Sequence, residues 1–175
     1  MKSRDLKILE AAIEIENDGR NFYLKSAELA KNAFAKKLLI SLADEELKHI
    51  DRIMEICEGL KEDRDWVDFD KKITKQIKAK LKLIFKPLSS SERKRLKMDP
   101  SDLRAFNMAM KKEKASYDFY EKQERTTKIP IAKKFYNRLK IEEERHYELL
   151  DEARFYLSDT ASWFVKQEGR VVEGG

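Results

Sequence analysis

Residues 45–49 read EELKH, and residues 142–146 read EEERH. Each stretch ends on one of the chain's only two histidines, with glutamates three and four residues before it. The two stretches are 97 residues apart, and the same shift places Phe22-Tyr23 on Phe119-Tyr120 without a gap. An internal repeat at this spacing indicates that the chain consists of two copies of one structural unit.

The composition favours long helices over sheet. Among 175 residues there are 5 Gly and 3 Pro, and 41% of the residues are charged. Apolar residues recur at steps of three and four, with breaks at Asn32 and at Asp99-Pro100, and predict helices over 4–31, 33–59, 100–127 and 130–158. A shorter amphipathic helix is predicted over 69–86, ended by Pro87.

The segment 60–100 joins the two predicted helix pairs and is too long for a tight turn. A connection of this length can cross a whole helical bundle. We therefore predict an all-α four-helix bundle made of two repeated helical hairpins, with the 69–86 helix inside the crossover. This domain is expected over 1–158, followed by an irregular tail over 159–175.

Both histidines fall at core positions of their predicted helices. In 33–59, steps of three and four from Leu39 reach Glu46 and His49, and in 130–158 the same pattern reaches Glu143 and His146. A charged or polar pair in an apolar seam is unusual, and here it occurs twice.

Each remaining long helix contributes one glutamate to the seam. Glu16 and Glu113 are repeat partners, and no other glutamate of the first helix has a glutamate 97 residues later. Glu45 and Glu142 also reach the histidines, but the seam places them on the helix flank. The predicted core cluster therefore consists of Glu16, Glu46, His49, Glu113, Glu143 and His146.

Four carboxylates facing one core need compensation, because a buried unpaired carboxylate is costly and like charges repel. No seam position offers Lys or Arg as a counter-ion. Two divalent metal ions balance four negative charges, and carboxylate oxygen with imidazole nitrogen suits iron or manganese. A single Glu-x-x-His is usually a solvated charge pair, but its gap-free repetition favours a metal site.

Four segments carry a resemblance to a known family: EIENDGRNFY (14–23), EELKH (45–49), KKEKASYDFY (111–120) and EEERH (142–146). Over about residues 4–158 the sequence resembles the ferritin-like di-iron carboxylate proteins, in the rubrerythrin-like branch. The resemblance implies a ferritin-like bundle in which Glu46 and Glu143 bridge two irons. It also implies terminal ligation by Glu16 and Glu113 and one histidine on each metal.

The resemblance implies an oxidoreductase that reduces peroxide or dioxygen in oxidative-stress defence, with ferroxidation for iron handling as the alternative. Two departures matter. Rubrerythrins with peroxidase activity carry an extra carboxylate where this chain has Ser116, whose repeat partner is Gly19. A rubredoxin domain needs four cysteines, and this chain has only Cys57, so electrons are expected from a separate electron donor protein or a small reductant.

Tyr23 and Tyr120 lie two helical turns from Glu16 and Glu113. They are predicted to hydrogen-bond ligand oxygens, to take part in redox chemistry, or to be ordinary core tyrosines. Gly19 and Ser116, one turn from the same glutamates, either leave space for an oxygen ligand or serve packing.

The net charge of +5 comes from residues 70–97, which alone carry +9. A binding module for an anionic surface is thus a third alternative, but we expect the lysines to be solvated, with no nucleic acid and no membrane partner. A charged N-terminal segment and a single cysteine predict a cytoplasmic location. A homodimer is expected, with Trp163 and Phe164 packing on the bundle or on a second subunit.

Overall fold

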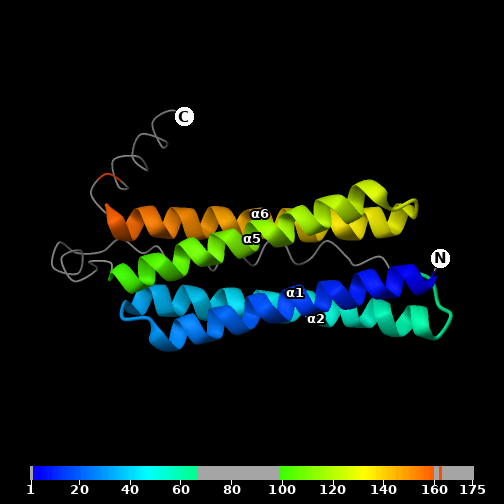
Figure 1. Cartoon of the computed structure of the whole chain (residues 1–175), viewed down its shortest axis with the longest axis horizontal. Helices are drawn as coiled ribbons and strands as arrows, with labels where there is room; N and C mark the ends of the chain where they lie inside the picture. Colours follow the sequence, from blue (N-terminus) through cyan, green and yellow to red (C-terminus); the bar gives the residue numbers. More distant parts are fainter. Residues whose placement is uncertain (1, 67–98, 160–161, 163–175) are drawn as a thin grey trace, which may run out of the picture.

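The computed structural model describes residues 2–66, 99–159 and 162. These residues form four long helices and contain no strand: α1 (Lys2–Leu29), α2 (Ala33–Lys61), α5 (Pro100–Thr126) and α6 (Pro130–Ser158) (Figure 1). The predicted all-α bundle of two helical hairpins is confirmed. The predicted 69–86 helix and nearly all of the 159–175 tail lie outside the described residues.

Short polar signals set the helix ends. The Asn32 side chain accepts hydrogen bonds from the backbone N–H of Phe34 (2.9 Å) and of Ala35 (3.2 Å) and so caps α2. Asp99 caps α5 by accepting from Ser101 N–H at 2.8 Å, and Pro100 follows in the first turn, where its missing donor costs nothing. The starts of α2 and α5 are therefore encoded locally.

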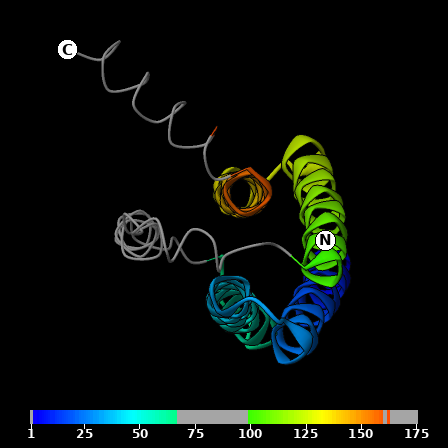
Figure 2. The same cartoon turned by 90° about the vertical axis from the view of Figure 1, so that its left-hand side faces the viewer.

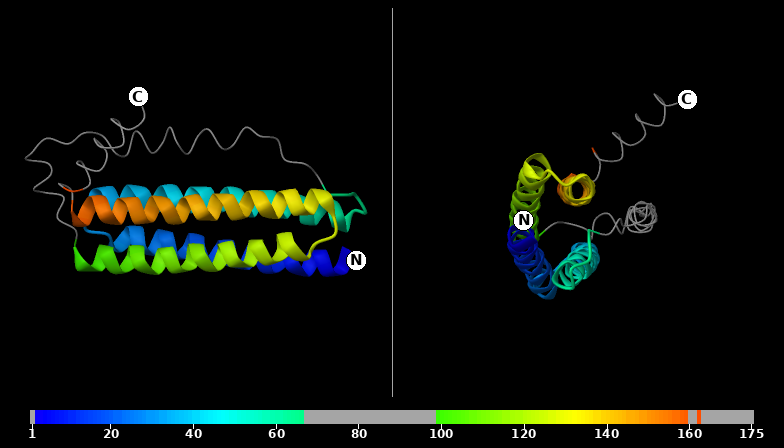
Figure 3. Two further views of the ribbon diagram at one scale, coloured as in Figure 1. Left: turned by 90° about the horizontal axis from the view of Figure 1, so that it is seen from above. Right: turned by 90° about the vertical axis from the view of Figure 1, so that its right-hand side faces the viewer.

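The helices pair in the order of the repeat. α1 packs along α2, and α5 along α6, while the end-on and top views place α1 beside α5 and α2 beside α6 (Figures 2 and 3). The end of α2 and the start of α5 lie at opposite ends of the bundle (Figure 1). The segment that joins them is the predicted crossover, of which residues 67–98 lie outside the described part of the chain.

A buried carboxylate of the second hairpin forms hydrogen bonds with the turn of the first hairpin. Asp102, near the start of α5, is 2% exposed and accepts from the backbone N–H of Lys31 (3.2 Å) and of Asn32 (3.0 Å) in the α1–α2 turn. Two backbone donors that the turn leaves unpaired are thereby satisfied.

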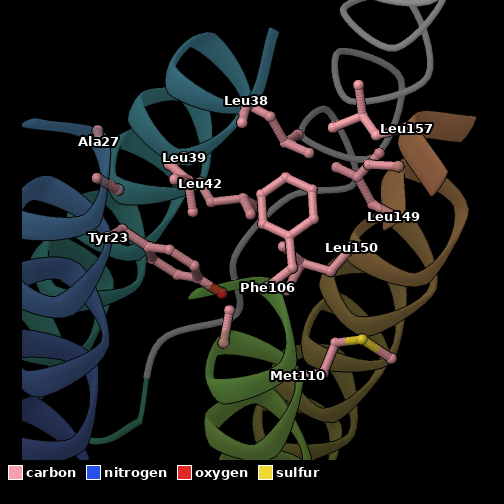
Figure 4. Close-up of a cluster of buried hydrophobic side chains, with 14 of the residues drawn as sticks. Tyr23, Ala27, Leu38, Leu39, Leu42, Phe106, Met110, Leu149, Leu150 and Leu157 are labelled. Carbon is pink, nitrogen blue, oxygen red and sulfur yellow. The ribbon is translucent and has the colours of Figure 1, made fainter. Parts of the chain in front are cut away.

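Two apolar clusters fill the bundle, one towards each end. The first contains Tyr23, Leu39, Leu42, Phe106 and Leu150, and Figure 4 shows its side chains converging from all four helices. The second contains Leu9, Ala12, Ile53, Tyr136 and Leu139, among others. Along every helix the predicted site glutamate falls between members of the two clusters. The polar layer is therefore closed at both ends by apolar side chains that exclude water.

None of the described helices combines the length and apolar character required to span a lipid bilayer.

Candidate metal centre

The structure brings all six predicted residues together in the middle of the bundle. α1 supplies Glu16, α5 supplies Glu113, and α2 and α6 each supply a Glu/His pair one turn apart. Every one of the six is at most 3% exposed. The spacing of three residues in each pair places both side chains on the inward face of their helix.

The six residues form two overlapping groups of possible metal ligands. Glu16 and His49 belong to the first group, and Glu113 and His146 to the second. Glu46 and Glu143 belong to both, and in each group one ligand atom per residue lies within 4.8 Å of the others. The two imidazole rings stack with centroids 5.5 Å apart and an interplanar angle of 18°. This arrangement suits two neighbouring ions that share two carboxylates.

The imidazoles present the same nitrogen to the carboxylates. His49 Nδ1 lies 3.2 Å from Glu16 Oε2, 3.1 Å from Glu46 Oε2 and 3.1 Å from Glu143 Oε1. His146 Nδ1 lies 3.4 Å from Glu46 Oε1 and 3.5 Å from Glu113 Oε2. In both halves Nδ1 is thus the atom available to a metal, and Nε2 points away from the cluster.

Burial and mutual repulsion shift the pKa values of the cluster. Burial, reinforced by the charges of Glu16, Glu46 and Glu113, holds the pKa of Glu143 well above its usual range. Burial and the charge of Glu46 raise the pKa of Glu16 to about 8, although His49 opposes the shift. Burial lowers the pKa of His49 and His146, but the surrounding carboxylates outweigh it and hold both pKa values well above normal. Without cations, the cluster therefore retains protons that water-exposed groups would lose.

A pair of divalent ions fits these residues. Within the described part of the chain, Glu46 Oε2, Glu113 Oε2, Glu143 Oε1 and both ring nitrogens of His146 are buried without a hydrogen-bond partner. Buried polar atoms normally have a partner, so the unpaired oxygens of these three glutamates together with His146 Nδ1 mark space for a bound species, whereas His146 Nε2 faces away from it. Carboxylate oxygens with imidazole nitrogens are ligands for iron or manganese, and two divalent ions offset four carboxylate charges.

Two tyrosines link the hairpins through the cluster. Tyr23 of α1 donates its hydroxyl hydrogen to Glu113 Oε1 of α5, and Tyr120 of α5 donates to Glu16 Oε1 of α1. Burial, followed by the nearby charge of Glu16, holds the pKa of Tyr120 well above normal, so this phenol stays protonated. The predicted hydrogen bonds to ligand oxygens are present, each reaching across to the other hairpin.

Gly19 and Ser116 lie beside the cluster but do not contribute ligand atoms to either group. A methyl group at Gly19 would meet Glu46 Cγ at 3.9 Å, which is ordinary van der Waals contact. Ser116 is 9% exposed. Gly19 therefore packs against a shared carboxylate, and its small size is not forced by a clash.

Glu45 and Glu142, which the sequence places on the helix flank, are buried in the structure. Their exposures are 5% and 3%, because the flank of α2 faces α6 as well as α1. Glu142 Oε2 accepts from His49 Nε2 at 2.8 Å and from Arg52 Nη1 at 2.8 Å. Burial raises the pKa of Glu142, but His49 and Arg52 outweigh it and lower the pKa to about 2.

Arg52 is the functional candidate that the seam analysis missed. It is off the seam yet only 7% exposed, and it supplies the buried positive charge that the seam lacks. The sequence contained a signal, because the repeat partner of Arg52 is the apolar Leu149. A charge standing where the other half has a buried apolar residue is a sign of a buried ion pair.

A cavity of about 360 Å³ leads from the surface to the cluster between α5 and α6. Its walls are Glu113, Lys114, Tyr117, Glu143, Glu144 and Tyr147. Glu113 and Glu143 are members of the buried cluster, so a small reactant or ion entering here meets two candidate ligands directly.

Comparison with known proteins agrees with the geometry. The sequence model of the rubrerythrin family matches residues 7–154, which cover all four described helices except for their outermost residues. Neither the curated proteins nor the solved structures include a match. On this match, and on a buried Glu/His cluster that fits a di-iron site, the resemblance inferred from the repeated motifs is confirmed: the chain belongs to the rubrerythrin family of ferritin-like di-iron carboxylate proteins.

Proposed function

We propose that the chain binds two iron ions, or an iron–manganese pair, and is an oxidoreductase that reduces peroxide or dioxygen in defence against oxidative stress. One observation carries the proposal: two overlapping groups of ligand atoms share Glu46 and Glu143 in a buried layer between two apolar clusters. In this proposal Glu46 and Glu143 would be shared by both ions, Glu16 with His49 would hold one ion, and Glu113 with His146 would hold the other.

The bound pair supplies two electrons for one reduction, one from each ion. The chain's own residues hold the site in place. Tyr23 and Tyr120 keep the carboxylates of Glu113 and Glu16 oriented by hydrogen bonds from the opposite hairpin. The apolar clusters exclude water from both ends of the layer, so that charges inside the site interact more strongly than in water. The cavity between α5 and α6, with a volume of about 360 Å³, has room for a small oxidant.

Ferroxidation for iron handling is the second candidate. The opening to the cluster has three glutamates in its wall, and carboxylates attract cations. Ser116 stands where peroxidase rubrerythrins have a further carboxylate, which weakens the analogy with a peroxide-specific enzyme. The separate electron donor, the homodimer and the cytoplasmic location remain predictions. The basic segment 70–97, on which the binding-module alternative rests, lies outside the described residues.

The decisive experiment loads the metal-free chain with iron(II) under anaerobic conditions and measures iron per chain. The reduced protein is then mixed rapidly with hydrogen peroxide or with dioxygen, and oxidation is followed by absorbance. Oxidation faster with peroxide supports the scavenger, whereas faster oxidation by dioxygen with mineral growth supports iron handling. Manganese(II) loading of the same sample tests the mixed pair.

Two ligand variants and one matched control accompany this experiment. Glu46→Gln and Glu143→Gln each remove a charge shared by both positions, and each is expected to lower the metal content below two per chain. Glu148→Gln, at an exposed glutamate of α6, is expected to behave as wild type. Unchanged metal content and reactivity in both ligand variants would refute the assignment.

A further inference from the structure

The two halves of the cluster differ in what lies behind their histidines. His49 Nε2 is hydrogen-bonded to Glu142 Oε2, and Arg52 Nη1 donates to the same oxygen, both at 2.8 Å. His49, Glu142 and Arg52 are 1%, 3% and 7% exposed. A buried chain of imidazole, carboxylate and guanidinium thus stands behind the first group of ligands.

Among the described residues, no such chain stands behind His146 in the second half. The repeat partner of Glu142 is Glu45, whose Oε1 is 2.7 Å from Lys48 Nζ on its own helix. The repeat partner of Arg52 is Leu149, which lies in an apolar cluster. His146 Nε2 is buried without a hydrogen-bond partner in the described part of the chain.

This difference acts on metal affinity through the imidazole. A histidine that binds metal through Nδ1 must carry its hydrogen on Nε2, and a carboxylate at Nε2 fixes both that tautomer and the ring's orientation. The carboxylate also increases the ligand's basicity, and loss of such a partner typically lowers metal affinity about 10- to 100-fold. Arg52 anchors Glu142 and compensates its buried charge, so that Glu142 remains an ionised acceptor.

The cavity between α5 and α6 adds a second difference between the two metal positions. Glu113 is a member of the His146 group alone, and it lines the cavity between α5 and α6 together with the shared Glu143. Neither Glu16 nor His49 lines that cavity. The half without the buried chain is thus the half beside this opening.

We propose that Arg52 is a positioning residue that, acting through Glu142, makes the His49 position the tighter of the two metal sites. The His49 position fills first, and the His146 position, beside the opening, fills second and exchanges its metal faster. This inference rests on the proposed two-metal site.

In the test, the metal-free full chain is titrated with cobalt(II), and binding is measured by calorimetry and by visible absorption. The titration is repeated with manganese(II), and binding is then measured by electron paramagnetic resonance. Wild type is expected to bind two ions in two steps whose dissociation constants differ by about 10- to 100-fold. The manganese spectrum should show an isolated ion after the first equivalent and a coupled pair after the second. His49→Ala should abolish the tight step, and His146→Ala the weak one.

Arg52→Leu gives the first half the residue of its repeat partner and is expected to weaken only the tight step, by about 10-fold or more. Arg52→Lys, which retains a positive charge, should restore part of the loss. If Arg52→Leu alone does not fold, the double variant Glu142→Gln/Arg52→Leu replaces it, because this variant leaves no uncompensated buried charge. The double variant should weaken the same tight step. Arg154→Leu is the control, because its guanidinium pairs with Asp151 and Asn107 away from the cluster.

Two results would overturn the inference: equal dissociation constants for both ions in wild type, or an unchanged tight step in folded Arg52→Leu. Either result leaves the two-metal proposal standing. Failure of wild type to bind two ions would instead refute the proposed function itself, so the two failures are distinguishable.

Discussion

Replacing Glu143 with Gln should have opposite effects on the metal-free and the metal-loaded protein. Glu143 is 1% exposed and shared by both ligand groups. Without metal its charge faces three other carboxylates, so an uncharged amide of the same shape relieves repulsion. With metal the same charge is a shared ligand, so its loss reduces binding. A glutamate serving only the structure of the bundle would not produce this change of sign.

The magnitude follows from the cluster's dimensions. Two ionised carboxylates with oxygens no more than 4.8 Å apart repel by about 3.5 kcal/mol at an effective dielectric constant of about 20. The folded metal-free protein avoids part of this repulsion by protonation, since burial and the neighbouring charges hold the pKa of Glu143 well above its ordinary value. The unfolded chain has no such shift, so folding takes up a proton between the two pKa values.

The sign of the pH dependence is fixed by this uptake. The stabilisation from a carboxyl group whose pKa is raised on folding is fully present below its unfolded pKa, and it is lost as pH rises from there through its folded pKa. Each such group contributes a slope of about −1.4 kcal/mol per pH unit to the unfolding free energy. Glu143→Gln should make the metal-free slope shallower by up to this amount, while Glu16, with its pKa raised to about 8, retains its own contribution.

The assay is urea unfolding followed by circular dichroism at pH 5.5, 7 and 8.5, with and without manganese(II). Metal-free Glu143→Gln should gain stability over wild type as pH rises. A hundredfold excess of metal over its dissociation constant should stabilise wild type by about 2.7 kcal/mol per site and the variant by less. Glu148→Gln controls for a change of surface charge on α6. A metal-free variant that is less stable than wild type at pH 8.5 would show that repulsion does not govern the cluster.

Three further predictions follow from particular contacts. Metal binding at pH 7 should release protons, because the raised pKa values of Glu16 and Glu143 leave protons to displace, and the affinity should rise as pH passes through about 8, the pKa of Glu16. Calorimetry in buffers of different ionisation enthalpy measures the release. Tyr120→Phe should lower the unfolding free energy measured in urea by about 1–3 kcal/mol and the metal affinity several-fold, because the hydrogen bond to Glu16 is lost. Slower oxidation of the bound metal at unchanged metal affinity would instead indicate that Tyr120 takes part in redox chemistry. Asp102→Ala should destabilise the protein by about 2–4 kcal/mol, because two backbone donors of the α1–α2 turn lose their acceptor, and Asp102→Asn should restore part of this in thermal unfolding.

The architecture could be predicted because two independent regularities agree. Steps of three and four define the inward face of each helix, and the 97-residue repeat requires the two hairpins to match. Where both conditions apply, as at Glu16 and Glu113, chance glutamates such as Glu10 are eliminated without any structure. Local cap signals at Asn32 and Asp99 then place the helix starts close to those observed.

The burial and the partners of side chains on the flank of the seam could not be predicted in this way. A seam drawn at single positions treats each helix as having one buried line, but a helix in a four-helix bundle contacts two neighbours and buries a stripe at least about 100° wide. Glu142 precedes the seam residue Glu143, and its side chain reaches His49 and Arg52 on α2. Which charged flank residue is buried depends on its partner across the bundle, and helical periodicity does not specify partners.

Such partners are better identified by comparing the two halves of the repeat for positions at which their residues differ. Glu16, Glu46, His49 and their counterparts are identical in type, so the ligands themselves give no reason for the two metal positions to differ. Any inequality must arise from residues that do not match across the repeat and that lie within reach of a ligand. Arg52 satisfies both conditions, since it stands opposite Leu149 and reaches His49 through a single carboxylate. A symmetric set of ligands on an asymmetric scaffold is therefore enough to give two ions of the same element different affinities.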